Sequence, residues 1–333
     1  MASIFVTGST KHVGEFFDYP RYRILESHSN DAFGCHRIAS NPDEADVVLF
    51  ATNYSFAPVG LGILTEIAFR RNTSRSVLFD SGDAPSPVTG GLCASWPNHD
   101  RTPGLAVGWC YHHPTSAEPM INSQPWQKPA YLWSFIGSQI THPVRAKVMR
   151  IGDPEGFVED TSEGSLPNLM GLTTPLDKEK FLNRYITVLE QSAFILCPIG
   201  KGLSSMRIFE AMRAGRAPVI ISDAWTPPPF VQWEQCSLRI PEAEVLQVPE
   251  FLRKHRDDAQ AMGERAREEW DRVFGPTGLF HHTVEASVAL VSARPKDYNL
   301  QCLKRCKIFL RPPWRRLFLR GLKGELISRL RRA

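Results

Sequence analysis

The stretch Cys197–Asp223, CPIGKGLSSMRIFEAMRAGRAPVIISD, reveals more about the fold than any other part of the chain. Two apolar runs flank a glycine loop and a short helical segment. FILC (Phe194–Cys197) is typical of a buried strand, and VIIS (Val219–Ser222) is typical of the next one. Gly200 and Gly202 let the backbone bend between them. The stretch therefore predicts a strand, a glycine loop, a helix and a second strand.

The predicted helix is well suited to hold an anion. Ser204 or Ser205 can cap its start, and Gly215 suits the residue just past its end. The free N–H groups and the dipole at a helix N-terminus attract negative charge. Arg207 in the first turn can clamp phosphate oxygens, and Glu210, one turn on, can accept hydrogen bonds from both ribose hydroxyls. The implied ligand is a nucleoside diphosphate.

Other interpretations of this loop and helix were weighed. Arg207 and Glu210 could simply pair with each other on a solvated helix surface. A Walker P-loop is excluded because no hydroxyl residue directly follows the lysine of GKG. The dinucleotide pattern G-x-G-x-x-G fails because Ser205 holds the third glycine position.

The rest of the chain alternates short apolar runs with helical patterns. Such alternation predicts an α/β fold with parallel sheets. The expected strands are Ile4–Thr7, Asp46–Ala51, Ser76–Phe79, Leu132–Ile136, Phe194–Cys197 and Val219–Ser222. The expected helices, besides the one after the glycine loop, are Gly62–Arg71, Asp177–Glu190 and Asp257–Phe274.

The length of 333 residues suits two domains rather than one core. The segment Asp83–Lys128 is rich in Pro, Gly, Trp and His and is expected to form loops near an edge or cleft. We place an N-terminal Rossmann-like domain at 1–128, a second one at 129–290 and a basic segment at 291–333.

Composition sets further expectations about location and partners. Seven scattered cysteines without a C-x-x-C pair favour a reducing compartment and give no zinc site. The N-terminus lacks the features of a signal peptide, and no apolar run reaches 18 residues. We therefore expect a cytoplasmic protein.

The C-terminus differs from the mildly acidic remainder of the chain. From Lys304 onward, eleven Lys and Arg residues stand against one acid, Glu325. Leucines and aromatic residues interleave with the arginines and form an apolar stripe at helical spacing. A basic amphipathic helix suits an anionic membrane surface, here the inner leaflet. Packing on the protein body and docking to a partner enzyme remain alternatives, and nothing else supports nucleic-acid binding.

The region around the glycine loop resembles the signature of the exostosin family of glycosyltransferases. The flanking stretches RYITVLEQSAF, SLRIPEAEV and LWSFIGSQITHPVRAKVM are also similar to that family, so the resemblance covers about 130–275. The positions that carry the signature are Pro198, Gly200, Gly202, Ser205, Arg207, Glu210, Ala211, Gly215, Pro218, Val219, Asp223, Pro229, Phe230 and Trp233.

The resemblance implies a GT-B fold, in which two facing Rossmann-like domains hold an acceptor and a nucleotide-sugar, usually a UDP-sugar. It implies inverting transfer, with Arg207 on the diphosphate and Glu210 on the ribose. Gly137 and Arg145 are further candidates near the diphosphate. The nucleotide site would be completed by the loop and the helix start, namely Gly200, Gly202, Ser204 and Ser205.

Inverting transfer needs a general base and positive groups for the departing diphosphate. Asp80 and Asp83, after the Ser76–Phe79 strand, are the first candidates for the base, although both could be turn-forming residues. His12 and Glu15 are the second choice. Asp223, at the end of its strand, is expected to touch the donor sugar or to orient the following loop.

Metal is not expected to take part. The chain contains no D-x-D triplet, and Arg207, the helix N-terminus and Arg145 or Lys201 can stabilise the leaving group without a cation cofactor. The pairs His112-His113 and His281-His282 lack metal-type partners at useful spacing and are taken as structural or surface residues.

We therefore expect an inverting, metal-independent glycosyltransferase that acts on a bacterial surface polysaccharide. Its partners would be a nucleotide-sugar donor and a glycan or lipid-linked glycan acceptor, with no nucleic acid. The alternatives are a GT-B fucosyltransferase using GDP-fucose and a non-catalytic glycan-binding or scaffold subunit with the same fold.

Overall fold

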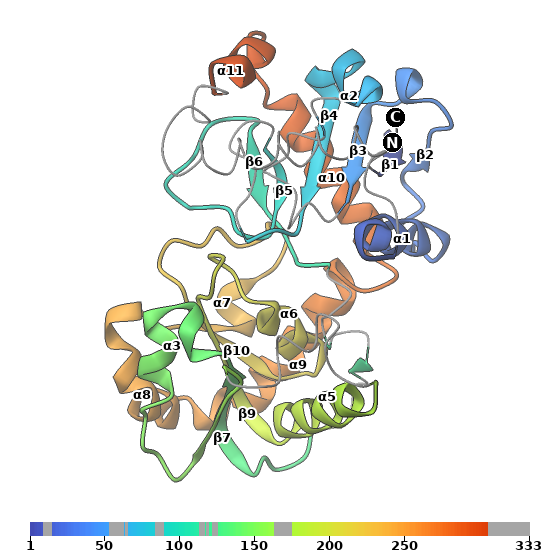
Figure 1. The fold of residues 1–333 in the computed structure, drawn as a ribbon. Coiled ribbons are helices and arrows are strands. Elements are labelled where there is room, and N and C mark those ends of the chain that lie inside the picture. Colours follow the sequence, from blue (N-terminus) through green and yellow to red (C-terminus); the bar gives the residue numbers. More distant parts are fainter. Residues whose placement is uncertain are drawn as a thin grey trace. The chain divides into compact units, whose positions relative to one another are not determined.

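The chain folds into two compact units (Figure 1). The structure is a computed structural model that describes residues 1–8, 15–52, 63, 66–83, 90–112, 117, 120–121, 126–162 and 175–305. Unit 1 consists of Met1–His113, Thr226–Pro229 and Pro276–Ala333, and unit 2 of Pro114–Trp225 and Phe230–Gly275. Each unit has its own parallel sheet, which confirms the predicted α/β class with two Rossmann-like domains.

Unit 1 is built on a sheet whose described strands follow the order β2-β1-β3-β4-β5-β6, all parallel. Every residue of β3 and β4 is buried, as expected for strands that helices cover on both faces. The strands are β1 (Ser3–Thr7), β2 (Arg37–Ile38), β3 (Val47–Ala51), β4 (Ser76–Asp80), β5 (Gly91–Cys93) and β6 (Ala106–Gly108). The helices are α1 (Glu15–Ser29), α2 (Ile67–Arg71), α10 (Leu279–Ser292) and α11 (Tyr298–Arg305), with 3-10 turns η1 (Pro42–Glu44) and η3 (Thr73–Arg75).

Unit 2 is built on a second parallel sheet, in which the described strands follow the order β11-β10-β9-β7-β8. The strands are β7 (Tyr131–Gly137), β8 (Gly156–Asp160), β9 (Ser192–Pro198), β10 (Ala217–Ile221) and β11 (Leu238–Arg239). The α-helices are α3 (Pro143–Val148), α5 (Pro175–Glu190), α6 (Met206–Arg213), α7 (Trp233–Cys236), α8 (Val248–Lys254) and α9 (Ala259–Val273). The 3-10 turns are η5 (Gln139–Thr141), η6 (Glu242–Gln247) and η7 (Arg256–Asp258).

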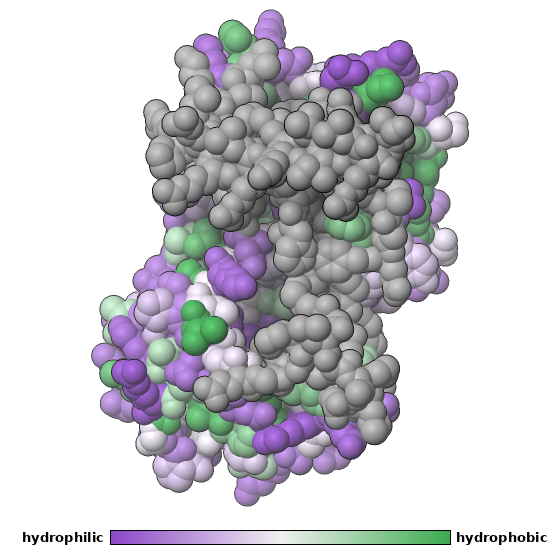
Figure 2. Space-filling view, in the orientation of Figure 1, coloured by the Kyte–Doolittle hydropathy of each residue, from purple (hydrophilic) through white to green (hydrophobic). Residues whose placement is uncertain are grey.

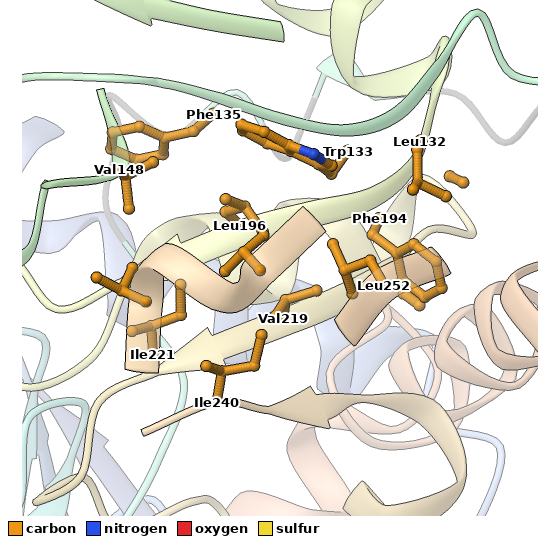
Figure 3. Close-up of a cluster of buried hydrophobic side chains, with 14 of the residues drawn as sticks. Leu132, Trp133, Phe135, Val148, Phe194, Leu196, Val219, Ile221, Ile240 and Leu252 are labelled. Carbon is orange, nitrogen blue, oxygen red and sulfur yellow. The ribbon is translucent and has the colours of Figure 1, made fainter. Parts of the chain in front are cut away.

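The core of unit 2 lies between the sheet and the helices that cover it. Phe194 and Leu196 of β9 and Val219 of β10 are fully buried and share a layer with Leu252 of α8 (Figure 3). Each such side chain contributes about 1.5–3 kcal/mol when removed from water. These interactions stabilise the sheet that carries the loops at the carboxyl ends of its strands.

Each predicted strand is present, with ends that shift by no more than two residues. The loop expected over Asp83–Lys128 differs, because β5 and β6 lie within it and extend the sheet of unit 1. Gly90, at φ 55°, explains the missed signal: a Cβ there would lie 1.9 Å from the Leu105 carbonyl oxygen. Glycine is needed where backbones pass so closely, but it weakens a strand pattern.

The unit boundaries also differ from those expected at 128 and 290. The first segment of unit 1 ends at His113, and the last segment of unit 2 ends at Gly275, after which the chain returns to unit 1. Helix α10 returns to unit 1, where it packs along β3 to β6 (Figure 1). Its buried face, which includes Phe280, Val284 and Leu290, supplies the apolar cover that this sheet needs.

In the described part of the chain, no helix has the length and apolar content needed to cross a membrane. The coloured surface of unit 2 in Figure 2 is a mixture of hydrophilic residues with scattered apolar ones. The basic segment from 306 onward, for which a membrane-binding helix was predicted, lies outside the described residues.

Candidate functional site

The glycine loop that joins β9 to α6 is fastened to the neighbouring strand. The Ile199 N–H donates to the Ile221 carbonyl oxygen at 2.9 Å. The Ser222 hydroxyl, just past β10, donates to the Leu203 carbonyl oxygen at 2.7 Å. These bonds fix the loop at the carboxyl edge of the sheet, where parallel α/β proteins bind ligands.

Arg145 of α3 holds the start of the glycine loop by hydrogen bonds to two backbone carbonyls. Its buried guanidinium donates from Nε to the Ile199 carbonyl at 2.9 Å and from a terminal nitrogen to the Pro198 carbonyl at 3.1 Å. A Cβ at Gly200 would lie 2.6 Å from that terminal nitrogen. Gly200 is therefore required by the approach of Arg145. The observed role of Arg145 is to shape the loop, and its predicted contact with a diphosphate stays a prediction.

Arg207, in the first turn of α6, points its guanidinium to the end of β7. Its Nε donates to the Ile136 carbonyl at 2.8 Å, and its central carbon lies 5.0 Å from the centre of the Phe135 ring. A Cβ at Gly137 would lie 2.5 Å from a terminal nitrogen of Arg207. Within the described residues, neither terminal nitrogen makes a hydrogen bond. The structure thus brings Gly137 and Arg207 together and leaves a fork of N–H donors for an anion.

Two serines at the start of α6 are buried without a partner. Ser204 and Ser205 are each 4% exposed, and neither hydroxyl finds a hydrogen bond in the residues that the structure describes. Ser205 holds the predicted N-cap position, but its side chain makes no capping bond, so that part of the prediction is corrected. Burying an unpaired hydroxyl costs roughly 1–3 kcal/mol, and a ligand oxygen would remove this cost.

A third buried hydroxyl, that of Thr161, lies at the same carboxyl edge of the sheet. Thr161 follows β8, and its N–H donates to the Gly137 carbonyl at 3.2 Å. Its buried Oγ1 has no hydrogen-bond partner among the described residues. Gly137 therefore lies between a fixed guanidinium and an unpaired hydroxyl.

Glu210 of α6 is buried rather than placed on a solvated surface. One carboxylate oxygen accepts from the Ala117 N–H at 2.9 Å, and the other accepts from the Tyr185 hydroxyl at 2.5 Å. Burial and this carboxylate raise the pKa of Tyr185 well above its usual value. The alternative of a solvated Arg207–Glu210 surface pair does not describe this arrangement. Sequence reasoning missed Tyr185 and Ala117 as partners of Glu210.

Asp223 is exposed just past β10 and is tied to the next segment. Its N–H donates to the Glu242 side chain at 3.0 Å, and its Oδ1 accepts from the Glu242 N–H at 3.2 Å. This reciprocal pair anchors the start of η6. The structure therefore gives Asp223 an orienting role, and its contact with a donor sugar stays a prediction.

The two carboxylates predicted for catalysis lie in unit 1. Asp80 ends β4, is buried, and accepts from the Gly82 N–H at 2.8 Å. Asp83 is exposed and accepts a hydrogen bond from the Tyr111 hydroxyl at 3.2 Å. The Tyr111 hydroxyl also lies 2.9 Å from the Ser95 hydroxyl. Sequence reasoning missed Tyr111 and Ser95. Both follow adjacent strands, β6 and β5, and only the strand order brings them to Asp83.

The other residues singled out from the sequence are Glu15 and several histidines. His12 and His113 lie outside the described residues, and Glu15 opens α1 with its side chain likewise outside them. His112 is buried against Phe79, and burial lowers its pKa to about 3. No metal-type partner at useful sequence spacing was predicted for His281, but the fold brings His36 and Glu285 beside it. His36 comes from a distant part of the sequence, so spacing along the chain could not reveal it.

Comparison with known proteins agrees with the predicted resemblance. Residues 107–255 match the model of the exostosin GT47 domain. The chain is 36% identical to exostosin-1 of Drosophila melanogaster over 120 residues, which is 35% of this chain and 15% of that protein. It is 34% identical to the exostosin-1 homolog of Caenorhabditis elegans over 90 residues, 26% of this chain and 24% of that protein. The matched segment is thus less than a quarter of these relatives' length.

Among solved structures, MurG of Acinetobacter baumannii is similar over 88% of this chain and 98% of its own, with 11% identity and a TM-score of 0.37. The matched sequence includes the glycine loop, Arg207 and Glu210, around which the site in unit 2 is built. On the evidence of this match and these relatives, residues 107–255 form a domain of the exostosin GT47 type.

Proposed function

We propose that the protein is an inverting glycosyltransferase that moves a sugar from a nucleotide-sugar, a UDP-sugar in our proposal, to a glycan acceptor. The observation that supports this most is the anion site in unit 2. There the Arg207 guanidinium is fixed beside Gly137, and the unpaired hydroxyls of Ser204 and Ser205 lie at the start of α6. The choice of uridine rests on the family resemblance.

The diphosphate would lie against the α6 N-terminus. Arg207 would donate two parallel N–H bonds to phosphate oxygens, and Ser204 and Ser205 would donate their hydroxyls. Arg145, held under the loop, adds positive charge without needing direct contact. Glu210 can still accept from ribose hydroxyls, because each carboxylate oxygen accepts more than one hydrogen bond.

In the reaction, the acceptor oxygen attacks the anomeric carbon as the bond to the diphosphate oxygen breaks. The leaving diphosphate gains negative charge in the transition state, and fixed guanidinium groups and helix N–H donors stabilise it. In our proposal these groups take the place of a metal ion. The acceptor proton moves to a base as the new glycosidic bond forms.

We assign the base to Asp83, with Asp80 supporting its turn. Asp83 is the exposed member of the pair and takes a hydrogen bond from Tyr111 that fixes its orientation. The Tyr111 hydroxyl stays protonated at neutral pH, because burial and the Asp83 carboxylate raise its pKa far above the usual value. It therefore holds Asp83 without competing as a base.

We also propose that the basic C-terminal segment binds an anionic membrane, which would place the enzyme at the inner face where lipid-linked glycan acceptors lie. The eleven Lys and Arg residues from Lys304 onward support this. Removal of the chain after Arg311 should abolish flotation with anionic liposomes. Unchanged flotation would refute the membrane assignment.

The activity is tested by incubating the protein with UDP-, GDP- and CMP-sugars in EDTA and measuring nucleotide release. UDP release that is lost in Arg207→Ala but kept in Arg265→Ala would support the proposal. Arg265 is a matched control, since it pairs with Glu268 on the surface of α9. Turnover of GDP-fucose alone would favour the fucosyltransferase alternative. Glycan binding without any turnover would favour the non-catalytic subunit.

A further inference from the structure

Unit 1 contains a cluster of three metal-ligating side chains away from both sets of residues above. His281 and Glu285 are one turn apart on α10, and His36 precedes β2. One ligand atom from each residue lies within 4.8 Å of those of the other two. His36 Nε2 and the Glu285 carboxylate are 2.9 Å apart. Residues at i and i+4 face the same way on a helix, so α10 presents both side chains to His36.

The two imidazoles are held in place, and one nitrogen of each ring makes no well-formed hydrogen bond within the described residues. The His36 side chain is 3% exposed, and Phe33 stacks on His281 with ring centres 3.9 Å apart. His36 Nε2 and His281 Nδ1 are both buried and make no well-formed hydrogen bond in the described residues. Buried polar atoms normally have well-formed hydrogen bonds, and a ligand held between His281 Nδ1, His36 Nε2 and the nearby Glu285 carboxylate would satisfy both nitrogens.

We propose that His36, His281 and Glu285 bind a divalent transition-metal ion of the zinc type. Two imidazoles and one carboxylate form a donor set that Zn²⁺ accepts, and a tetrahedral ion would keep a fourth position for water. Ligand atoms around such an ion lie about 3.3 Å apart, so the cluster needs shifts of about an ångström or less to close. The exposed Glu285 side chain can supply much of this movement.

Metal binding has a defined consequence for His36. Its Nδ1 now accepts from the Ala2 N–H at 3.3 Å. With the metal at Nε2, the ring proton moves to Nδ1, which becomes a donor. The long contact from Ala2 is then lost, and Nδ1 donates to another acceptor or to water.

The site would fasten α10 to the segment before β2. Helix α10 is the element that returns to unit 1 late in the chain, and it packs along β3 to β6. A metal that joins His36 to two α10 residues would therefore stabilise unit 1. This role is independent of the proposed transfer reaction, because none of the three residues belongs to the nucleotide site or to the Asp83 turn.

The test uses the full-length protein without a histidine tag, stripped with EDTA and dialysed. Zn²⁺ titration should give one equivalent bound, and the melting temperature of the protein should rise. His281→Ala and Glu285→Gln should each weaken binding at least about tenfold, since even changes next to metal ligands cost roughly 10–100-fold. His99→Ala, which removes an exposed histidine of unit 1, should bind as the unaltered protein does.

Co²⁺ provides a second measurement that does not depend on the stability of the variants. The intact protein should give the intense visible bands of four-coordinate Co²⁺, and Glu285→Gln should lose them while staying folded. The proposal is overturned if Zn²⁺ does not bind in one equivalent, or if His281→Ala and Glu285→Gln bind it as tightly as His99→Ala. Nucleotide-sugar turnover in EDTA is a separate result and leaves this test unaffected.

Discussion

The carboxyl edges of the two parallel sheets carry opposite chemistry. In unit 2 this edge collects the guanidinium groups of Arg145 and Arg207, together with hydroxyls that have no hydrogen-bond partner among the described residues. In unit 1 it carries the carboxylates of Asp80 and Asp83, whose hydrogen bonds come from a backbone N–H and from Tyr111. The same strand order therefore carries guanidinium groups at one edge and carboxylates at the other, and our proposal of an anion site in unit 2 and a base in unit 1 rests on this difference.

The two edges differ in the charged side chains that their strand ends and turns hold there. In unit 2, Gly137 and Gly200 make room for guanidinium groups that backbone carbonyls then hold. In unit 1, Asp80 accepts from the Gly82 N–H in the turn that follows β4, and Asp83, the base in our proposal, is exposed.

The largest expected effect concerns the base in unit 1. Asp83→Asn keeps an oxygen that can accept from Tyr111 but cannot take a proton. We expect kcat to fall by about 10²–10⁴-fold, the usual contribution of a general base. UDP affinity should stay the same, because the anion site lies in unit 2. Steady-state kinetics with a titration of UDP checks both, and unchanged kcat would remove Asp83 from the mechanism.

Acid should affect unit 1 through His112. Burial lowers the pKa of His112 to about 3, so the folded protein keeps it neutral while the unfolded chain protonates it near pH 6.5. Its contribution to stability is present above that pH and is lost at about 1.4 kcal/mol per pH unit as pH falls toward 3. Denaturant unfolding from pH 7 to 4.5 should show a shallower dependence in His112→Gln. Equal slopes would mean that His112 is charged in the fold.

A methyl group at Gly137 should disturb the anion site more than the fold. Its Cβ would lie 2.5 Å from an Arg207 nitrogen, so the guanidinium must move. Overpacking of this kind costs about 1–3 kcal/mol, and we expect UDP affinity to fall by about tenfold or more in Gly137→Ala. Gly152→Ala is the matched control, since a Cβ there meets nothing within 4 Å. Equal affinities in the two variants would contradict the placement of Arg207.

The smallest expected effect comes from the unpaired serines. Ser204→Ala should leave the free protein as stable as before or more stable, because it removes a buried hydroxyl without a partner. It should weaken UDP binding by about 0.5–1.5 kcal/mol. Ser222→Ala should instead destabilise the free protein, since its bond to the Leu203 carbonyl is lost. A Ser204→Ala protein that melts earlier but binds normally would argue against a ligand role.

Local patterns predicted much of this fold from the sequence. The six expected strands are continuous apolar runs, and burial on both faces of a parallel sheet requires such runs. The glycine loop, α6 and the left-handed Gly215 also follow from neighbouring residues. β5 and β6 were missed because they are three residues long and include glycines.

The parts that could not be predicted depend on contacts between distant residues. The buried Glu210 accepts a hydrogen bond from the Ala117 N–H, 93 residues earlier, and no local pattern links the two residues. Arg145 was expected at the diphosphate, but the loop carbonyls that it holds are more than 50 residues away. The cluster of His36, His281 and Glu285 requires α10 to return to unit 1, which the expected domain boundary did not include.

Calorimetric titration with UDP in EDTA tests the central claim most directly, using the intact protein, Arg207→Ala and Arg265→Ala. We predict that the intact protein and Arg265→Ala bind UDP alike and that Arg207→Ala binds it about 100-fold more weakly, the loss expected for a charged hydrogen-bond partner of phosphate. Equal UDP binding by Arg207→Ala, or no UDP binding by the folded intact protein, would contradict the assignment of this edge as the donor site.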